Sequence, residues 1–301
     1  MNDRGVIEQI ITFMKERGIL PKNIEKTSFR SLFFYNVYDN PIGQFIFYDV
    51  ATGVDSNEDT ALLKALVEHF ERIAFKELYS RHGAFSEVSS SDGFAAFPTT
   101  SVNALSIARK NALAEAIERY VWSFWWDENT AASVRQVTLS DLDVATRELL
   151  GFMAESSKVE SIFLVQPQVN NYSEYSTIIL FARYKSGGFV SGGATGETFD
   201  KTIFRAASEL IRHYLAMGKF KDTGMEPTTF YEKRLVYFGS GRGDSLVERR
   251  LKNKSGFSVE LPNLSVDRPV DYSYSGVVAV HHCRFEGQHP FVGGELERLC
   301  L

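Results

Sequence analysis

One helical pattern occurs three times along this chain, and the repetition limits the folds that the chain can adopt. The copies begin at Ala61, Ala108 and Thr202, and the first two both contain Glu-x-x-Glu-Arg in the same register. The third copy keeps the Ala and the first Glu but has Arg where the second Glu stood. Strand-like stretches precede these helices, so the pattern indicates an α+β fold in which helices pack on antiparallel sheets and the unit repeats internally.

The polar residues of each copy fall on one helical face, because residues three and four apart are neighbours on a helix. A single Glu-x-x-Glu-Arg would most simply be a solvated face with charge pairs, but two copies in one register disfavour that interpretation. Paired carboxylates on facing helices suit Mg²⁺, which takes oxygen ligands and leaves room for substrate phosphates. Small and apolar neighbours such as Ala65 and Ala112 indicate that the carboxylates are partly enclosed. The polar triads are residues 64, 68 and 71, residues 111, 115 and 118, and residues 205, 209 and 212.

Composition bounds the class of protein. A net charge of −5 argues against nonspecific nucleic-acid binding, which needs a basic surface. No stretch approaches the ~20 apolar residues that cross a bilayer, and no signal-peptide core follows Met1, so we expect a cytoplasmic protein without a membrane anchor. Cys283 and Cys300 do not make a disulfide framework. No interdomain linker is visible, so we expect a single domain over residues 1–301.

Local patterns predict the order of the elements. We expect a Gly-rich turn at 186–196 that caps the following helix, and a loose loop at 238–244. Trp122, Trp125 and Trp126 could stack on adenine, although a core aromatic cluster is favoured. The expected helices are 4–17, one from Ser56, one from Thr99 into the Trp-rich segment, 140–154 and 198–217, and short elements lie near 244–252. The expected strands are 31–38 and 44–50, joined by a hairpin at 39–43, then 85–97, 159–166, 176–184 and 276–285.

The second copy and its surroundings resemble the YcaO family of ATP-dependent enzymes that activate a peptide backbone amide. The resemblance rests on Ser89-Ser-Ser-Asp-Gly-Phe-Ala, on Asn111-Ala-Leu-Ala-Glu-Ala-Ile-Glu-Arg and on the Trp-rich tail that follows. The first copy is similar to the family's Ser-x-x-x-Glu-x-x-Glu motif, and the third to its Arg-Ala-x-x-Glu helix after a Gly-rich segment. His289-Pro-Phe is similar to a stretch seen in many members. The motifs occur in family order and span residues 53–291.

The resemblance implies a nucleotide chamber lined by the three helices, with ATP and Mg²⁺ as cofactors. It also implies a reaction: ATP- and Mg²⁺-dependent phosphorylation of a backbone amide, for azoline, amidine or thioamide formation in ribosomal peptides. Phosphoryl transfer asks the protein mainly for positioning and charge neutralisation. The implied Mg²⁺ ligands are Glu68, Glu71 and Glu115. The implied nucleotide contacts are Lys64, Asn111, Glu118, Arg205 and Glu209.

The chain departs from the family pattern at several positions. Lys64 stands where the first motif has Ser, and Val54 follows Gly53 where many members have Gly-Lys-Gly. Lys64 could pair with Glu68 four residues later or could reach a phosphate. The Pro-x-Pro-x-Pro tail of azoline-forming members is absent from the last residues. An alternative is therefore a degenerate family member that binds a peptide or a partner without catalysis.

Partners and other sites complete the expectations. The catalytic-type region begins near Met1 without an additional module, so we expect a peptide substrate and a separate leader-binding or activating protein, with no nucleic acid, no membrane and a possible homodimer. His281 and Cys283 share one face of an expected strand, and with His289 and Cys300 they form a weak zinc alternative. No Ser-His-Asp or Cys-His nucleophile pattern is visible, so the catalytic residue is left open.

Overall fold

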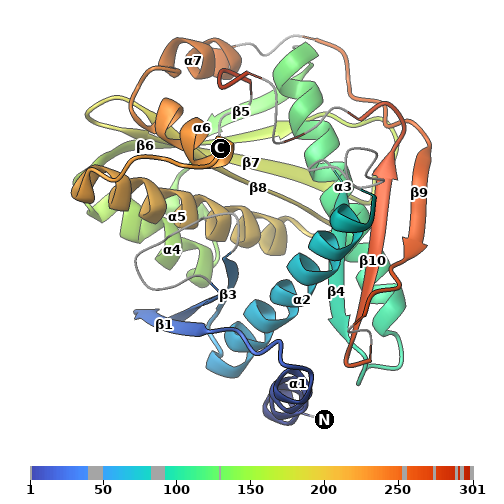
Figure 1. Ribbon diagram of the computed structural model, residues 1–301. Helices are drawn as coiled ribbons and strands as arrows, with labels where there is room; N and C mark the ends of the chain where they lie inside the picture. The colour runs from blue at the N-terminus through green and yellow to red at the C-terminus, as the bar shows by residue number, and fades with distance from the viewer. Residues whose placement is uncertain are drawn as a thin grey trace. The chain divides into compact units, whose positions relative to one another are not determined.

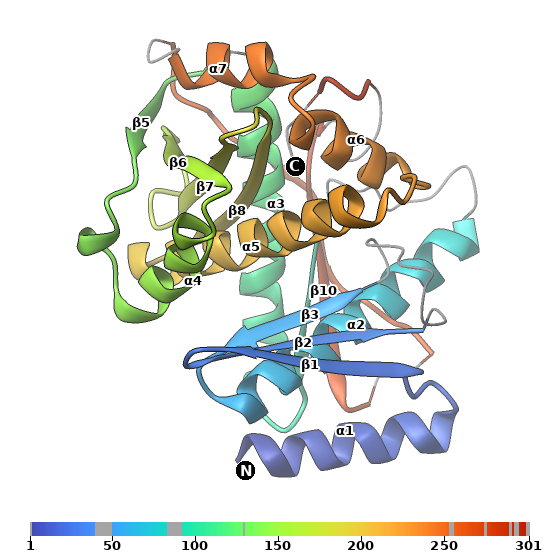
Figure 2. The ribbon, with the colours of Figure 1, turned by 90° about the vertical axis from the view of Figure 1, so that its left-hand side faces the viewer.

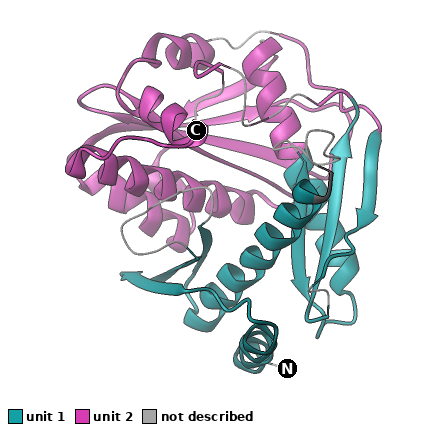
Figure 3. Ribbon diagram, in the orientation of Figure 1, with its two compact units in different colours: residues 1–116, 264–286 teal, residues 117–263, 287–301 magenta. Residues whose placement is uncertain are grey.

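The computed structural model is mixed α and β, and its helices and strands are interspersed along the chain (Figure 1). It divides into two compact units, residues 1–116 with 264–286 and residues 117–263 with 287–301 (Figure 3). This division into units does not test whether residues 1–301 form a single domain, so that expectation stays a prediction. The structure describes residues 2–39, 50–82, 92–128, 130–252, 256–273, 276–288, 291 and 295–298.

The first unit contains two antiparallel three-stranded sheets and three helical segments. One sheet has the order β1 (Asn23–Phe29), β2 (Leu32–Tyr38), β3 (Ala51–Asp55), and the other has the order β4 (Gly93–Pro98), β10 (Val278–Phe285), β9 (Leu264–Pro269). Helix α1 (Asp3–Arg17) packs on α2 (Glu58–His82), which covers β2 and β3, as Figure 2 shows. The unit also holds the first part of α3 (Ala104–Glu128). Apolar residues of α1, α2 and both sheets form its core.

The second unit is built on one four-stranded antiparallel sheet. The strand order is β5 (Ala132–Gln136), β6 (Val159–Pro167), β7 (Ser176–Tyr184), β8 (Phe189–Gly196). Helices α4 (Val144–Glu155) and α5 (Phe199–Thr223) cover one face (Figure 2). The opposite face packs on the second part of α3, on α6 (Phe230–Gly239) and on α7 (Asp244–Lys252), with a short 3₁₀ turn at Leu139–Asp141. Trp122, Trp125 and Trp126 are buried on that face, which confirms the core aromatic cluster.

The sequence repeat has a structural counterpart, because a strand glycine touches a helix backbone in each copy. A Cβ added to Gly53 of β3 would lie 1.9 Å from the Ala61 carbonyl oxygen of α2, and one added to Gly93 of β4 would lie 1.9 Å from the Ala112 carbonyl oxygen of α3. A Cβ on Gly192 of β8 would lie 2.2 Å from the Leu210 nitrogen of α5. Only glycine permits such approach. The strand–helix unit therefore occurs three times; the repeat predicted the three helices, whereas β8 of the third unit was expected as a turn.

Several predicted elements are confirmed close to their expected ends. Helix α1 ends at Gly18, whose φ of 66° is the left-handed conformation that glycine adopts readily. Helix α2 begins after Asn57, whose side chain accepts a hydrogen bond from the Thr60 N–H at 3.0 Å. The strands expected at 159–166, 176–184 and 276–285 correspond to β6, β7 and β10. The expected hairpin and strand between residues 40 and 49 lie outside the described residues, as do residues 85–91 of the expected strand at 85–97.

Two local predictions were wrong, and a third was right only in part. Residues 189–196, expected as part of a turn that caps a helix, form β8, because their glycines accommodate α5 and Trp122 at the buried sheet surface. Ser140 does not cap α4; Asp143 does, by accepting the N–H groups of Ala145 and Thr146. The loop expected at 238–244 is shorter in the structure, a turn at 240–243 between the end of α6 and the start of α7. Among the described residues, no helix is long and apolar enough to cross a membrane.

Candidate functional site: carboxylates bound to open strand edges

Glu68 is fixed on both of its carboxylate oxygens. It lies on α2, and its Oε2 accepts a hydrogen bond from the Thr52 N–H of β3 at 2.9 Å. Its Oε1 accepts one from the Arg72 guanidinium at 2.7 Å, an i,i+4 ion pair on the same helix. β3 is an edge strand of its sheet, so the Thr52 N–H would otherwise lack a ladder partner. The carboxylate satisfies this main-chain donor and is held rigidly in return.

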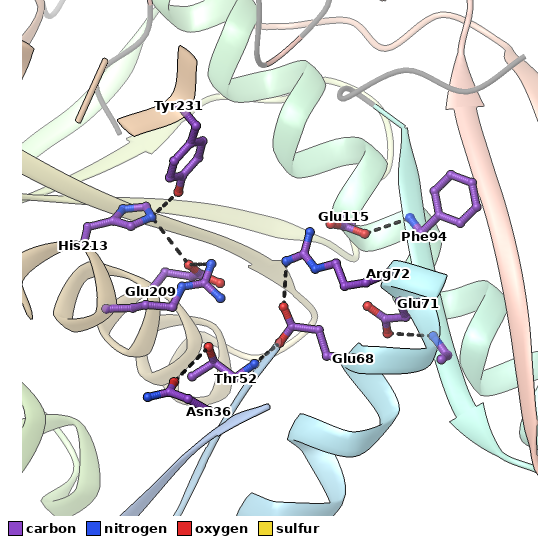
Figure 4. A network of polar contacts seen from close by, with 12 residues as sticks. Asn36, Thr52, Glu68, Glu71, Arg72, Phe94, Glu115, Glu209, His213 and Tyr231 are labelled. Atoms are coloured by element: carbon purple, nitrogen blue, oxygen red, sulfur yellow. Dashed lines mark hydrogen bonds and ion pairs between the residues drawn. The ribbon is translucent and has the colours of Figure 1, made fainter. Parts of the chain in front are cut away.

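Glu71 and Glu115 use the edge of β4 in the same way. The Ala96 N–H donates to Glu71 Oε1 at 2.7 Å, and the Phe94 N–H donates to Glu115 Oε2 at 2.8 Å (Figure 4). The Thr99 N–H donates to the Val277 carbonyl, so the odd-numbered residues of β4 bond to β10 and the even-numbered ones face outward. Two carboxylates from two helices therefore bind successive outward N–H groups of one strand.

The three carboxylates are close enough to repel one another. Burial, followed by the charges of Glu115 and Glu68, holds the pKa of Glu71 well above its ordinary value. All three side chains are partly buried rather than solvated. A group of carboxylates that burial and mutual charge destabilise is the arrangement that a bound cation relieves. The oxygen donor set suits Mg²⁺, and the main-chain hydrogen bonds leave carboxylate lone pairs for a ligand. The residues of this unit therefore fit the ion that the sequence pattern implies.

Lys64 and Asn111 lie one turn before Glu68 and Glu115 on their helices. The Lys64 ammonium donates to Asp55 Oδ2 at 2.7 Å and to the Val54 carbonyl at 3.1 Å, so it is not paired with Glu68. Burial tends to raise the pKa of Asp55, but the hydrogen bond from Lys64 brings it below its ordinary value. Asn111 is half-buried on α3. The partner of Glu68 is Arg72, to which the sequence interpretation gave no role although it completes the repeated Glu-x-x-Glu-Arg.

The second unit carries the remaining predicted residues. Arg205 is exposed on α5, and its guanidinium donates to the Thr195 carbonyl at 3.2 Å. Glu209, one turn further, forms an ion pair with Arg212. Glu118 is half-buried on the second part of α3. Arg205 and Glu209 therefore share one face of α5, as the i,i+4 spacing predicted.

A buried histidine in the second unit was not found from the sequence. His213 Nδ1 lies 2.5 Å from the Ser191 carbonyl, so this nitrogen carries the proton, and Nε2 accepts from the Tyr231 hydroxyl (Figure 4). Burial and then the charge of Arg212 lower the pKa of His213 to about 3, so the ring is neutral. Its Nε2 lies 4.0 Å from Glu209 Oε2. Only the adjacency of His213 to the third copy's Arg212 could have drawn attention to it.

In the structure, the residues that cluster at the expected zinc site differ from those that the sequence suggested. Register pairs Asp267 of β9 with Cys283 of β10, and donor atoms of these two residues and His281 lie within 4.8 Å of one another. Asp267 is already bound by the Arg109 guanidinium at 2.9 and 2.5 Å and by His281 Nε2 at 2.8 Å. This ion-pair network accounts for the group without a metal. The other two residues of that alternative, 289 and 300, lie outside the described residues.

A second network occupies the opposite face of β10. Asp92 is fully buried and accepts hydrogen bonds from His282 at 2.7 Å and from the Arg284 guanidinium at 2.6 Å on each oxygen. The His282 ring stacks on Phe94, whose N–H binds Glu115. The network thereby supports the strand that holds two of the carboxylates.

Comparison with known proteins identifies the fold. No protein-family model matches the chain, and no curated protein does. Among solved structures, the YcaO protein from Methanopyrus kandleri bound with AMPPCP and Mg²⁺ is similar over 97% of this chain and 92% of its own, with a TM-score of 0.62 and 12% identity. The E. coli microcin synthetase McbBCD complex with pro-MccB17 bound is similar over 88% of this chain and 87% of that one, with a TM-score of 0.54 and 11% identity. The chain has a YcaO-like fold.

Proposed function

We propose that this chain is an ATP- and Mg²⁺-dependent enzyme that activates a peptide backbone amide by phosphorylation. The observation that carries the proposal is the cluster of three carboxylates in the first unit, in which Glu68, Glu71 and Glu115 each accept a hydrogen bond from a strand N–H. The YcaO-like fold supports it, because one structure with this fold has bound AMPPCP and Mg²⁺ and another has a bound pro-peptide. The reaction class is a peptide-modifying one.

The proposed metal ligands are Glu68, Glu71 and Glu115. Mg²⁺ bound there would neutralise phosphate charge on the nucleotide. The strand N–H groups hold one oxygen of each carboxylate, so the side chains are positioned before any ligand binds. Arg72 offsets part of the negative charge at Glu68 and limits the repulsion among the three groups.

The proposed nucleotide contacts of the second unit are Arg205 and Glu209 on α5, with Glu118 on α3. The exposed guanidinium of Arg205 suits a phosphate, which it can bind through two N–H groups. The Arg212 and His213 contacts restrict the Glu209 carboxylate. Lys64 and Asn111 are the corresponding proposed contacts of the first unit.

Calorimetric titration tests nucleotide binding. We expect ATP to bind in the presence of Mg²⁺ and to bind weakly or not at all without it. Glu68→Gln, Glu115→Gln and Arg205→Ala should each weaken binding, because each removes a charge from the metal–phosphate group. Glu8→Gln is the matched control, since Glu8 lies on α1 with 72% of its side chain exposed. No Mg²⁺-dependent binding to the protein together with its partner would refute the proposal.

Position 64 tests whether the departure from the family pattern matters. Because Lys64 binds Asp55 rather than Glu68, Lys64→Ser should not restore activity by freeing that carboxylate. If Lys64 reaches a phosphate during turnover, Lys64→Ala lowers ATP affinity or turnover, and a control Lys76→Ala leaves both unchanged. Equal ATP affinity and turnover in Lys64→Ala and wild type would exclude a phosphate contact.

Mass spectrometry tests the reaction itself. A candidate peptide incubated with the chain, ATP, Mg²⁺ and a leader-binding or activating protein should lose water on ring or amidine formation, or exchange oxygen for sulfur in a thioamide. The same mixture with Glu115→Gln should leave the peptide mass unchanged. Peptide binding without any nucleotide turnover, in a mixture that contains the partner, would instead establish the non-catalytic scaffold.

A further inference from the structure

Among the described residues, main-chain groups at the outer edge of the second unit's sheet have no hydrogen-bond partner. The Val137 N–H donates to the Ile162 carbonyl at 2.8 Å, and the Gln168 N–H donates to the Ala131 carbonyl at 3.0 Å. In this antiparallel pair the odd-numbered residues of β5 therefore bond to β6, and the even-numbered ones direct both N–H and C=O outward. Within the described part of the chain, no hydrogen bond occupies the outward main-chain groups of Val134 and Gln136.

This edge differs from the edges of β3 and β4. There, the outward N–H groups of Thr52, Phe94 and Ala96 are taken by carboxylates of the same unit. Such internal capping protects an edge from pairing with another chain. β5 has no corresponding cap among the described residues, so its edge is available to a further strand.

A hollow adjoins the same edge. It has a volume of about 300 Å³ and lies between β5 and α7, with Val134, Phe163, Phe189 and Leu251 among its lining residues. Val134 packs on the sheet face that α7 covers, so the side chains of even-numbered β5 residues share the face of the hollow. A strand added to β5 would place every second side chain on that face.

The charges around the edge favour an acidic partner. Arg183 and Lys252 line the hollow together with one carboxylate, Glu248, and the edge-strand residue Arg135 borders it. Glu248 is held by Arg183 at 3.0 Å and lies 3.7 Å from Lys252, whereas Arg135 is exposed without an ion pair among the described residues. Arg135 points to the face opposite Val134, because successive strand residues alternate. An acidic residue directly across from Arg135 on an added strand would form an ion pair with it.

We propose that the β5 edge binds an extended peptide segment of the pattern apolar–acidic–apolar, added as an antiparallel strand. The two apolar side chains enter the hollow beneath α7, and the acidic side chain between them lies beside Arg135. Main-chain hydrogen bonds to Val134 and Gln136 hold the segment, while the hollow and Arg135 select its sequence. The surface uses none of the residues assigned to the nucleotide, so the proposal stands apart from the proposed function.

Fluorescence anisotropy of a labelled peptide, without nucleotide, tests the sequence pattern. The probe is acetyl-Gly-Thr-Phe-Glu-Phe-Thr-Gly-amide, and its control, acetyl-Gly-Thr-Phe-Phe-Glu-Thr-Gly-amide, has the same composition without the alternation. We expect saturable binding of the probe, at least about tenfold tighter than that of the control, because the control cannot place both rings on one face. Equal affinities, or no saturable binding of the probe, would overturn the proposal.

Methylation of single peptide nitrogens tests strand addition. In an antiparallel pair, residues across from Val134 and Gln136 exchange both hydrogen bonds with them, so the two Phe nitrogens face β5 and the Glu nitrogen faces away. Methylating either Phe nitrogen should weaken binding by about tenfold or more, and methylating the Glu nitrogen should leave it nearly unchanged. If none of the three methylations weakens binding, or if only methylation of the Glu nitrogen does, antiparallel strand addition is ruled out.

Charge exchange tests the contact with Arg135. Arg135→Glu should weaken probe binding by about threefold or more, and a probe with Lys in place of Glu should recover it. Arg249→Glu is the matched control, because Arg249 is exposed on α7 and does not line the hollow. Equal loss in both variants would show a general charge effect and would contradict the proposed pairing.

Discussion

Replacing Gly93 by alanine should separate β4 from α3. The added Cβ would lie 1.9 Å from the Ala112 carbonyl oxygen and 2.6 Å from the Ala116 nitrogen. Ordinary contact begins near 3.4 Å, so strand and helix must part by about 1.5 Å. Both neighbouring atoms belong to the main chain, and no side-chain rotation can relieve the overlap.

The separation has two energetic consequences. The Glu115 carboxylate accepts the Phe94 N–H at 2.8 Å, and a displacement of this size breaks the bond. Loss of a hydrogen bond to a charged group costs about 1.5–3 kcal/mol, and overpacking adds about 1–3 kcal/mol. We therefore expect Gly93→Ala to lower the free energy of unfolding by about 2.5–6 kcal/mol.

Urea-induced unfolding followed by circular dichroism measures the effect. The matched control is Gly276→Ala in the same unit, where the described neighbours of the new Cβ would be two Phe13 ring carbons at 3.5 and 3.8 Å. We expect a change of less than about 1 kcal/mol there. If Gly93→Ala changed stability no more than Gly276→Ala does, the close strand–helix approach would be disproved.

Three further predictions follow from perturbed ionisation. Burial and the charges of Glu115 and Glu68 raise the pKa of Glu71, so the metal-free protein loses stability as pH rises above the ordinary carboxylate range. In thermal unfolding without Mg²⁺, Glu71→Gln should be more stable than wild type near pH ~8 and equally stable near pH ~4. Hydrogen bonds from Arg109 lower the pKa of Asp267 to about 2, although burial acts in the opposite direction. The pair therefore contributes stability above the ordinary carboxyl pKa, about 1 kcal/mol or less because it is partly exposed, and this stability is lost as pH falls toward 2. Arg109→Ala should remove this loss, which unfolding in urea at a series of pH values measures. Burial lowers the pKa of His213 to about 3, so wild type should lose stability as pH falls below the ordinary histidine pKa of ~6.5, and His213→Gln should have a flatter Tm profile between pH ~6.5 and ~4.

The repeated helices were predictable from sequence because their signals are local and long. Helical periodicity and the Glu-x-x-Glu-Arg register identify α2 and α3, and glycine after residue 17 ends α1. Short strands at edges were not predicted: β1, β5 and β9 carry many exposed polar residues, so their pattern lacks an apolar face. β8 was missed because its glycines normally indicate a turn, and only packing against α5 makes them necessary.

The candidate site was predictable in its residue types but not in its geometry. Spacing places Glu68, Glu71 and Glu115 on polar helix faces, and the family resemblance implies them as Mg²⁺ ligands. That each binds an outward N–H depends on which strand edges remain open, and this is decided by pairing between segments far apart in the chain, such as β4 with β10. Tyr231 and His213 meet across 18 residues, and no periodic signal joins them.

Main-chain anchoring of the carboxylates has an evolutionary consequence. A peptide N–H is present at every residue except proline, so the donors at positions 52, 94 and 96 do not depend on which side chains the strands carry. Apart from Gly53 and Gly93, the strand side chains can therefore change without loss of these donors, whereas a site of the proposed kind depends on the three acids of the helices. Selection on such a site would act on few positions, and the same scaffold could persist between chains that share only 12% of their residues.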